Sequence, residues 1–444
     1  MSKLLRILLA LFTGLTIVSV VFLFIIRRDG TATTMQPKKV FILRNGKKFT
    51  LYRNGHPFFI KGAAGTGHLA RLSQAGGNTL RTWDTTHLQQ ILDDAAANNI
   101  AVIAGLSLPF SFTHSFYDNT SLVTAQFNAY RDVIRKYRSH PALLMWSLGN
   151  EVDFPYSYHF RRFYKVYNEL LDMIHQEDPD HPVSTAIINV DRRNILNIKM
   201  KVPDLDLITL NTFGKLSQID RTLSELTWCW NGPFLISEWG TNGPWEAEYT
   251  VWGAPIETTS TNKAQQYLER SAMLPVNSPR FLGACCFFWG QKQESTHTWY
   301  SLFSEDGKAS ETVNVLQQIW TGTTPTHHAP SVKYMLLNGK GAQNNILLQS
   351  DGSYTAELLM DESQQPDSTT VSWEILAEDW VRKDPSELNL NKPATINAQR
   401  SADATNKWLF RAPKQEGPYR IFVTVFDNKG YFSTANTPFY VVEK

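Results

Sequence analysis

Short apolar runs alternate with amphipathic segments along most of the chain, from about residue 58 to residue 320. Each run is nearly continuous in aliphatic and aromatic residues, as is typical of parallel strands buried on both faces. The eight runs are 58–64, 78–83, 100–108, 142–151, 182–188, 205–213, 233–240 and 281–290. The predicted helical segments are 68–76, 87–99, 122–137, 159–176, 193–200, 217–230, 262–274 and 310–320. Eight such units predict a (β/α)₈ (TIM) barrel.

A doubly wound open sheet is the alternative arrangement for alternating strands and helices. Such a sheet usually has fewer strands, and no Gly-rich phosphate loop follows the first run. Before that run, Asn-Gly turns separate short strands and predict a hairpin that leads into the barrel. We therefore place the barrel at residues 36–322.

A Pro/Thr-rich linker, residues 323–331, follows the barrel. Beyond it, short β-rich runs such as "VSWEI" and "YRIFVTVF" are separated by Asn, Asp, Gly and Pro, which predicts a small antiparallel β-sandwich over residues 332–444. The runs "SWEI" and "GPYRIFVTVFDNKGYFSTANTPFYV" are similar to immunoglobulin-like domains of surface enzymes. Such a domain is either a spacer or a carbohydrate- or protein-binding module.

The first 30 residues have the pattern of a transmembrane anchor. "MSKLLR" is basic, and Ile7–Ile26 contains 20 uncharged residues before "RRDG". A helix of this length spans roughly 30 Å, the thickness of a bilayer core. A cleaved signal peptide has a shorter apolar run and a small-residue exit, so we expect an uncleaved anchor and an extracytoplasmic barrel.

The composition argues against several classes of protein, namely nucleic-acid-binding, disulfide-rich and metal-binding proteins. The net charge is only +2, which argues against nucleic acid as a partner. The three cysteines are Cys229, Cys285 and Cys286, too few for a disulfide framework and without metal spacing. We therefore predict no metal and no cofactor. The 13 Trp residues are mostly core, but aromatic rings also form platforms for sugars.

Two glutamates end predicted strands. Glu151 ends the fourth run and Glu238 lies near the end of the seventh, where barrel enzymes carry their catalytic groups. Glycoside cleavage with retention needs two carboxyl groups ~5–5.5 Å apart, one as acid/base and one as nucleophile. Arg81 in the second run would favour the charged form of the nucleophile. Trp289 in the eighth run offers a floor for a sugar ring.

The motifs "RNGHPFFIKGAAG", "NTLRTWD", "MWSLGNEV", "LISEWG" and "FFWG" resemble the barrel of glycoside hydrolase family 2, in clan A, the family of β-galactosidases and β-glucuronidases. Their order is also similar to that in β-1,3-glucanosyltransferases. The resemblance implies that Glu151 is the acid/base and Glu238 the nucleophile. It further implies that Asn150 bonds the sugar 2-hydroxyl. Trp239, beside Glu238, completes the predicted substrate-binding set.

The sequence departs from the family in two respects. Phe213 stands where the family usually has a tyrosine that hydrogen-bonds the nucleophile, which favours slow turnover or transfer. Asn211 is a candidate substitute for that hydroxyl. The β-sandwich domains that precede the barrel in family 2 enzymes are replaced by an apolar segment and a hairpin, which favours an open cleft.

The leading interpretation is a membrane-anchored retaining glycosidase or transglycosylase that acts on a β-linked glycan. The alternative is a non-catalytic barrel for glycan binding or for polysaccharide export and assembly, for which Phe213 is the best support. Retention of both glutamates favours catalysis. Trp245 and Trp252, in the loop after the seventh run, are candidate walls of the substrate cleft.

Overall fold

The eight predicted strands form a closed parallel barrel, so the predicted barrel fold is confirmed. The computed structural model describes residues 39–361, 369–380, 391–401 and 406–443. Around the barrel the strands are β10 (Phe234–Trp239), β11 (Phe281–Trp289), β4 (Ile60–Gly65), β5 (Thr79–Arg81), β6 (Ala101–Leu106), β7 (Leu143–Leu148), β8 (Val183–Ile188) and β9 (Leu207–Asn211). Nearly all their residues are buried, which explains the continuous apolar runs.

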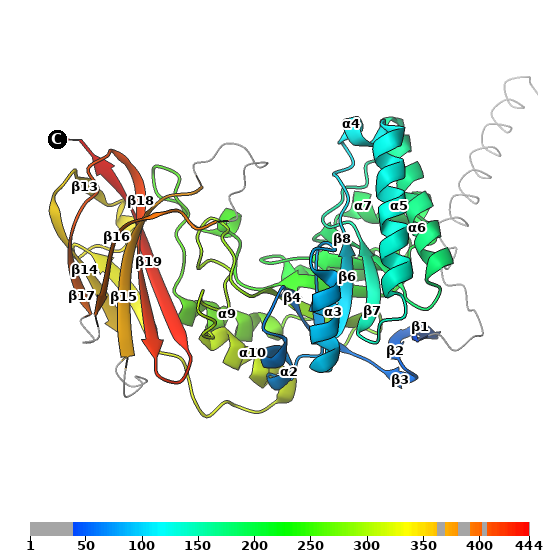
Figure 1. Cartoon of the computed structure of the whole chain (residues 1–444), viewed down its shortest axis with the longest axis horizontal. Coiled ribbons are helices and arrows are strands. Elements are labelled where there is room, and N and C mark those ends of the chain that lie inside the picture. Colours follow the sequence, from blue (N-terminus) through cyan, green and yellow to red (C-terminus); the bar gives the residue numbers. More distant parts are fainter. Residues whose placement is uncertain (1–38, 362–368, 381–390, 402–405, 444) are drawn as a thin grey trace, which may run out of the picture. The chain divides into compact units, whose positions relative to one another are not determined.

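Helices follow the barrel strands. They are α2 (Leu69–Gln74), α3 (Leu88–Ala97), α5 (Thr120–Tyr137), α6 (Arg161–Glu177), α7 (Arg192–Lys201), α8 (Ile219–Glu225), α9 (Ser260–Ser271) and α10 (Glu311–Thr321). Short turns occur as α4 (His114–Tyr117), η1 (Tyr158–Phe160), η2 (Leu216–Gln218), η3 (Pro244–Glu246) and η4 (Ala342–Asn344). The Asn119 side chain caps α5 by accepting hydrogen bonds from the backbone N–H groups of Ser121 and Leu122. Figure 1 shows α3, α5 and α6 beside strands β6 to β8.

The chain divides into two compact units, and the division cuts through barrel strands β4, β10 and β11. In the part of the chain that the structure describes, the first unit comprises residues 39–60, 79–237 and 275–285. The second unit comprises residues 61–78 and 238–274 and the described residues between 286 and 443. The first unit therefore holds most of the barrel. The second holds α9, α10 and the C-terminal sheets.

An N-terminal hairpin in the first unit matches the sequence prediction. Its strands are β1 (Val40–Asn45), β2 (Lys48–Arg53) and β3 (His56–Pro57). The backbone N–H of Phe49 donates to Pro279 O at 2.7 Å, and Arg53 Nη2 donates to Pro141 O at 2.9 Å. Pro279 and Pro141 both precede barrel strands. The hairpin thus lies against the amino-terminal end of the barrel, opposite the end where catalytic groups are expected.

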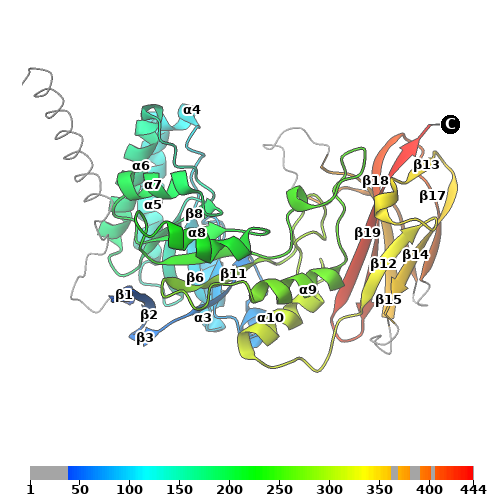
Figure 2. The ribbon, with the colours of Figure 1, turned by 180° about the vertical axis from the view of Figure 1, so that it is seen from behind.

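The C-terminal region is a β-sandwich in the second unit. One sheet contains β12 (Val332–Leu337), β14 (Ser353–Met360) and β17 (Lys407–Arg411). The other contains β13 (Leu347–Gln349), β19 (Phe432–Val442), β18 (Gly417–Asp427), β15 (Thr369–Ala377) and β16 (Thr395–Ser401). Buried side chains from both sheets form one hydrophobic core around Trp373 and Phe439. The finer prediction of an immunoglobulin-like topology stays a prediction. Figure 2 shows these sheets from behind.

Buried charges join this sandwich to loops of the second unit. Arg420 on β18 donates to Glu378 Oε1 at 2.9 Å, to Asn436 Oδ1 at 2.7 Å and to Pro255 O at 2.7 Å. Pro255 lies in the long loop between β10 and α9. The sandwich is therefore bonded to a loop that follows a barrel strand.

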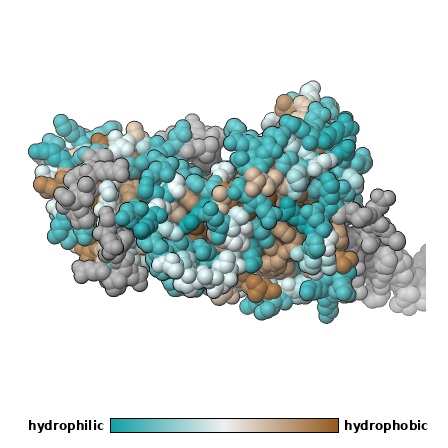
Figure 3. All heavy atoms as spheres, turned by 60° about the horizontal axis from the view of Figure 1, so that its bottom comes forward, coloured by the Kyte–Doolittle hydropathy of each residue, from teal (hydrophilic) through white to brown (hydrophobic). Residues whose placement is uncertain are grey.

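The predicted anchor Ile7–Ile26 lies outside the described residues. Within the described ranges, no helix has the length and apolar character needed to cross a bilayer. Figure 3 shows a face on which hydrophilic residues predominate and hydrophobic residues form small groups.

Candidate active site

Glu151 stands directly after β7 on a sharply turned backbone. Its φ is 54°, in the left-handed region, and that of Gly149 is 80°. A Cβ atom on Gly149 would lie 2.3 Å from Val152 Cγ2, so this position requires glycine. A non-glycine residue in the left-handed region costs about 1–3 kcal/mol, and such residues occur in turns and at active sites. The "GNE" motif is thus a turn that presents a carboxylate at a strand end.

A chain of hydrogen bonds surrounds Glu151 within the first unit. Asn211 Nδ2, at the end of β9, donates to Glu151 Oε1 at 2.9 Å and to Asn150 Oδ1 at 3.1 Å. Asn211 Oδ1 in turn accepts from Ser237 Oγ on β10 at 2.7 Å. On the other side, Arg81 Nη2 donates to Asn150 Oδ1 at 2.5 Å. Four strand ends therefore converge on one polar network, as strand-end chemistry in a barrel requires.

Arg81 is buried and held by its surroundings. Only 1% of the residue is exposed, and its guanidinium carbon lies 4.9 Å from the centre of the Trp83 ring. Contact with an aromatic face and a bond to Asn150 fix the guanidinium orientation. The sequence predicted Arg81, Asn150, Asn211 and Glu151 as site residues, and the structure brings these four together.

Asn211 contacts the predicted acid/base. Its amide donates to Glu151 and Asn150. The suggestion that it replaces a tyrosine hydroxyl at the nucleophile stays a prediction. Phe213, two residues later, is 8% exposed and brings no hydroxyl to the site.

Glu238 and Trp239 end β10 and belong to the second unit. Glu238 is 5% exposed, and Trp239 is 1% exposed with its ring centre 5.4 Å from that of Tyr267. Burial raises the pKa of the nearby Tyr300 phenol, and the negative charges of Glu294, Glu246 and Glu238 add to that rise. Glu238 is therefore a buried carboxyl with a buried phenol in its electrostatic neighbourhood.

Trp289 has a packing position. It is fully buried, and its indole Nε1 donates to His68 O at 3.3 Å. The rings of Phe303 and Trp320 lie 5.1 and 6.0 Å away, centre to centre. A fully buried ring presents no face to a sugar, so its burial gives no support to the stacking role of Trp289, which stays a prediction. Trp239 is equally enclosed and offers no exposed face.

One residue of the network was missed at the level of sequence. Ser237 bonds Asn211, and the signal that points to it is its position beside Glu238 in "LISEWG".

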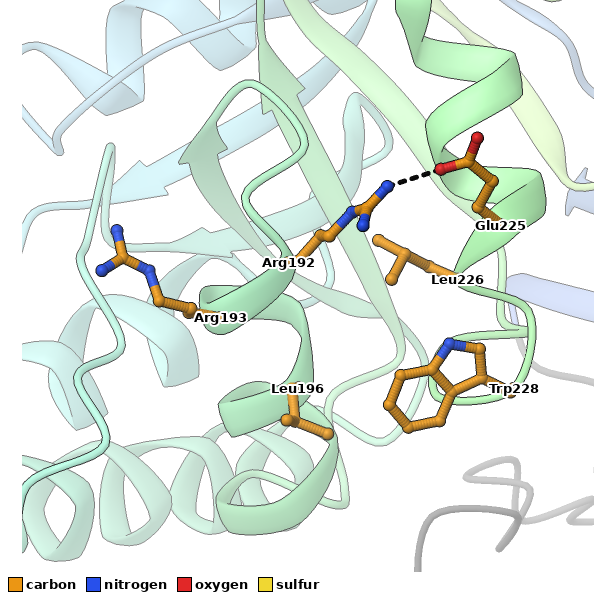
Figure 4. A pocket seen from close by; sticks show the side chains of 6 residues that line it. All are labelled: Arg192, Arg193, Leu196, Glu225, Leu226 and Trp228. Carbon is orange, nitrogen blue, oxygen red and sulfur yellow. Dashed lines mark hydrogen bonds and ion pairs between the residues drawn. The ribbon is translucent and has the colours of Figure 1, made fainter.

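A separate pocket lies on the outer surface of the first unit. Figure 4 shows its lining by Arg192, Arg193, Leu196, Glu225, Leu226 and Trp228. Its volume is about 230 Å³, and Arg192 pairs with Glu225 at 2.5 Å. None of the predicted site residues lines it, so the candidate active site remains the strand-end network.

Comparison with known proteins agrees with this geometry. The profile of the glycosyl hydrolases family 2 TIM barrel domain matches residues 81–244. The β-glucuronidase of Chlorocebus aethiops is 28% identical over 181 residues, which cover 37% of this chain and 26% of that protein. The matched profile includes Arg81, Asn150, Glu151, Asn211 and Glu238.

Solved β-glucuronidases share the fold. That of Bifidobacterium dentium, complexed with coumarin-3-O-glucuronide, has a TM-score of 0.51 at 18% identity and covers 64% of this chain and 49% of its own. That of Faecalibacterium prausnitzii has a TM-score of 0.50 at 20% identity, with coverages of 65% and 52%. The chain thus spans about half the length of these solved relatives or less. The chain thus contains a closed (β/α)₈ barrel, and residues 81–244 of it are similar to the TIM barrel domain of the glycosyl hydrolases family 2.

Proposed function

We propose that this protein is a retaining glycoside hydrolase or transglycosylase that acts on a β-linked glycan. The observation that carries the proposal is the strand-end network around Glu151 in a family 2 type barrel, with Glu238 at the end of β10. The similar proteins are β-glucuronidases, which supports cleavage of an O-glycosidic bond by this chain.

The proposed reaction has two displacements. In the first, the Glu151 carboxyl gives its proton to the glycosidic oxygen while the Glu238 carboxylate attacks the anomeric carbon. The bond to the leaving sugar breaks, and a glycosyl ester forms on Glu238. In the second, Glu151 takes a proton from water or from a sugar hydroxyl, whose oxygen attacks the same carbon and frees Glu238.

The polar network supports this division of roles. The bond from Asn211 to Glu151 Oε1 leaves the second oxygen, Oε2, for a leaving group. The link from Arg81 to Asn150 holds the amide that we propose bonds the sugar 2-hydroxyl. A 2-hydroxyl contact that strengthens in the transition state contributes directly to the rate.

Products from a panel of β-glycans test the proposal. The purified full-length protein would be incubated with soluble β-glucans, xylans, mannans and aryl β-glycosides, and products followed by mass and by NMR of the anomeric proton. We expect a new reducing end that appears first as the β-anomer, or a lengthened glycan if transfer dominates. Initial release of the α-anomer would contradict the retaining mechanism.

Phe213 favours a second candidate, a glycan-binding or polysaccharide export and assembly barrel without catalysis. In that case the protein would bind a glycan of the same panel, and no product would form. Product formation that is lost in Glu238→Ala rejects this second candidate.

We further propose that Ile7–Ile26 anchors the protein and that the barrel is extracytoplasmic, because polymeric β-glycans occur outside the cytoplasm. A reporter fused after Lys444 tests this. Activity of an alkaline-phosphatase-type reporter supports the topology, and activity from a cytoplasm-dependent reporter alone contradicts it.

A further inference from the structure

Exposed aromatic side chains concentrate on loops at strand ends. Among the residues that the structure describes, the aromatic side chains more than half exposed are Phe110, Phe112, Tyr156, Tyr158, Trp245 and Tyr249. All six follow β6, β7 or β10 in the chain. Single exposed apolar residues are ordinary, but a concentration of rings at one kind of position marks a binding surface.

Four of these rings share the first unit and form what we call the aromatic rim: Phe110, Phe112, Tyr156 and Tyr158. They are 52%, 60%, 76% and 77% exposed, respectively. Phe110 and Phe112 stack with ring centres 5.2 Å apart and planes within 7°. The rim thus presents large ring surfaces to solvent on the loops after β6 and β7.

The two loops of the rim lie against each other. His114, after β6, has its ring centre 5.5 Å from that of Phe160, after β7. Arg162 Nη1 pairs with Asp118 Oδ1 at 3.0 Å. The four rings therefore belong to one continuous region of the first unit.

The backbone beneath the rim is held in place. Tyr117 Oη donates to Pro109 O at 2.6 Å, immediately before Phe110. Tyr164 Oη donates to Pro155 O at 2.9 Å, and Lys201 Nζ donates to Tyr156 O at 2.7 Å. Since the backbone is tied to buried elements, the exposure of the rings is a feature of the fold. A fixed platform also loses little conformational entropy on binding.

Along the chain, the second loop of the rim follows the proposed acid/base. Tyr156 is five residues after Glu151, a distance of at most about 18 Å for an extended chain. A cationic group lies over one face of each tyrosine ring, with Lys201 Nζ 5.0 Å from the ring centre of Tyr156 and Arg161 Cζ 4.8 Å from that of Tyr158, and leaves the other face for a sugar. Rings beside hydrogen-bond donors match the chemistry of a sugar, which has an apolar face edged by hydroxyl groups.

We propose that the aromatic rim binds sugar units of a glycan chain that lie beyond the scissile bond, so the substrate is an oligo- or polysaccharide. The inference rests on the proposed function, because the position of the scissile bond is defined by Glu151. Beyond the proposed function, it specifies that the substrate is longer than one sugar unit and names the residues that bind the additional units.

Chain-length dependence tests the rim. Oligosaccharides of two to eight units, prepared from the β-glycan that the protein cleaves, would be compared for wild type, Phe112→Ala, Tyr156→Ala and Tyr158→Ala. We expect the gain in kcat/KM from the shortest to the longest chain to fall roughly 3- to 10-fold per ring removed. Trp228→Ala is the matched control, since Trp228 is an exposed ring (49%) on another part of the first unit.

Equal losses on short and long chains, or loss in Trp228→Ala as large as in the rim variants, would overturn the inference and leave the proposed function standing. Absence of cleavage by the wild type would instead contradict the proposed function. Native affinity gels that contain soluble β-1,3-glucan, xylan or mannan then test separately whether the aromatic rim binds glycan. Retardation of the wild type that is lost in Tyr156→Ala and Tyr158→Ala supports it, and unaltered or absent retardation contradicts it.

Discussion

At the scale of single residues, Glu151 illustrates how a short motif encodes chemistry. Its left-handed backbone and the glycine two residues before it turn the end of β7 and direct a carboxyl into a polar network. The network was only partly foreseeable from sequence. Strand ends were visible as the ends of apolar runs, but the bond between Asn211 and Glu151 depends on side-chain directions that periodicity does not report.

Replacement of Glu151 tests its role as acid/base. Glu151→Ala should lower kcat roughly 10²–10⁴-fold on substrates with poor leaving groups, and much less on activated aryl glycosides, because those need no proton. Added azide should then form a β-glycosyl azide of retained configuration, which chromatography and NMR detect. Equal losses on both kinds of substrate, without azide product, would assign Glu151 a structural role.

Trp289 carries a different prediction now that its burial is known. Trp289→Ala removes a fully buried ring and should lower the free energy of unfolding by about 3–5 kcal/mol. Urea unfolding followed by circular dichroism measures this. Trp228→Ala, at an exposed ring, should change it by less than about 1 kcal/mol. A stable Trp289→Ala protein with a raised KM would support the platform role.

At the scale of elements, the barrel strands were predictable because burial on both faces requires a continuous apolar run in the sequence. Helix ends were less visible. The predicted helix at residues 217–230 ends in the structure at Glu225, and α9 begins at Ser260, where the Thr259 side chain caps it. The Thr259 cap moves the start of α9 two residues ahead of the predicted start at residue 262, because a capping hydrogen bond is independent of apolar periodicity.

Glu374 on β15 gives a pH-dependent prediction. Burial alone would raise the pKa of its carboxyl, but hydrogen bonds and charges from His297 and Lys392 outweigh burial and lower the pKa to about 2. A lowered folded-state pKa contributes stability above the unfolded value near 4.5 that is lost as the pH falls toward 2. The contribution is at most about 3 kcal/mol.

Urea unfolding of Glu374→Gln between pH 3 and pH 7 checks this. The variant should be less stable than the wild type at pH 6, and the difference should shrink steadily below pH 4.5. Glu357→Gln serves as the control, because Glu357 forms an exposed pair with Lys407. A difference that does not vary with pH would show that the ion pairs of Glu374 contribute nothing to stability.

At the scale of the whole molecule, a buried arginine attaches the sandwich to a loop of the second unit. Arg420 binds Glu378 in the sandwich and also the backbone of the loop after β10. Long-range polar contacts of this kind leave no local trace in sequence, since Pro255 and Arg420 are far apart in the chain. The strands of the sandwich were foreseeable and its attachment was not.

Arg420→Met should therefore destabilise the second unit by about 3–5 kcal/mol, because Glu378 is left as an unpaired buried carboxyl. Differential scanning calorimetry of the full chain measures the loss. The matched control is Arg411→Met, which breaks an exposed pair with Asp351 and should change stability by under about 1 kcal/mol. Equal effects of the two variants would contradict a buried attachment.

We propose that Glu238 forms a covalent glycosyl-enzyme, and trapping of this intermediate is the most direct experiment. The full-length protein would be treated with an activated 2-deoxy-2-fluoro β-glycoside of the sugar that it cleaves, and then analysed by intact mass and peptide mapping. We expect one sugar per protein, attached to Glu238, released by an acceptor and absent in Glu238→Ala. A label on another residue, or full turnover of substrate with no labelling, would contradict it.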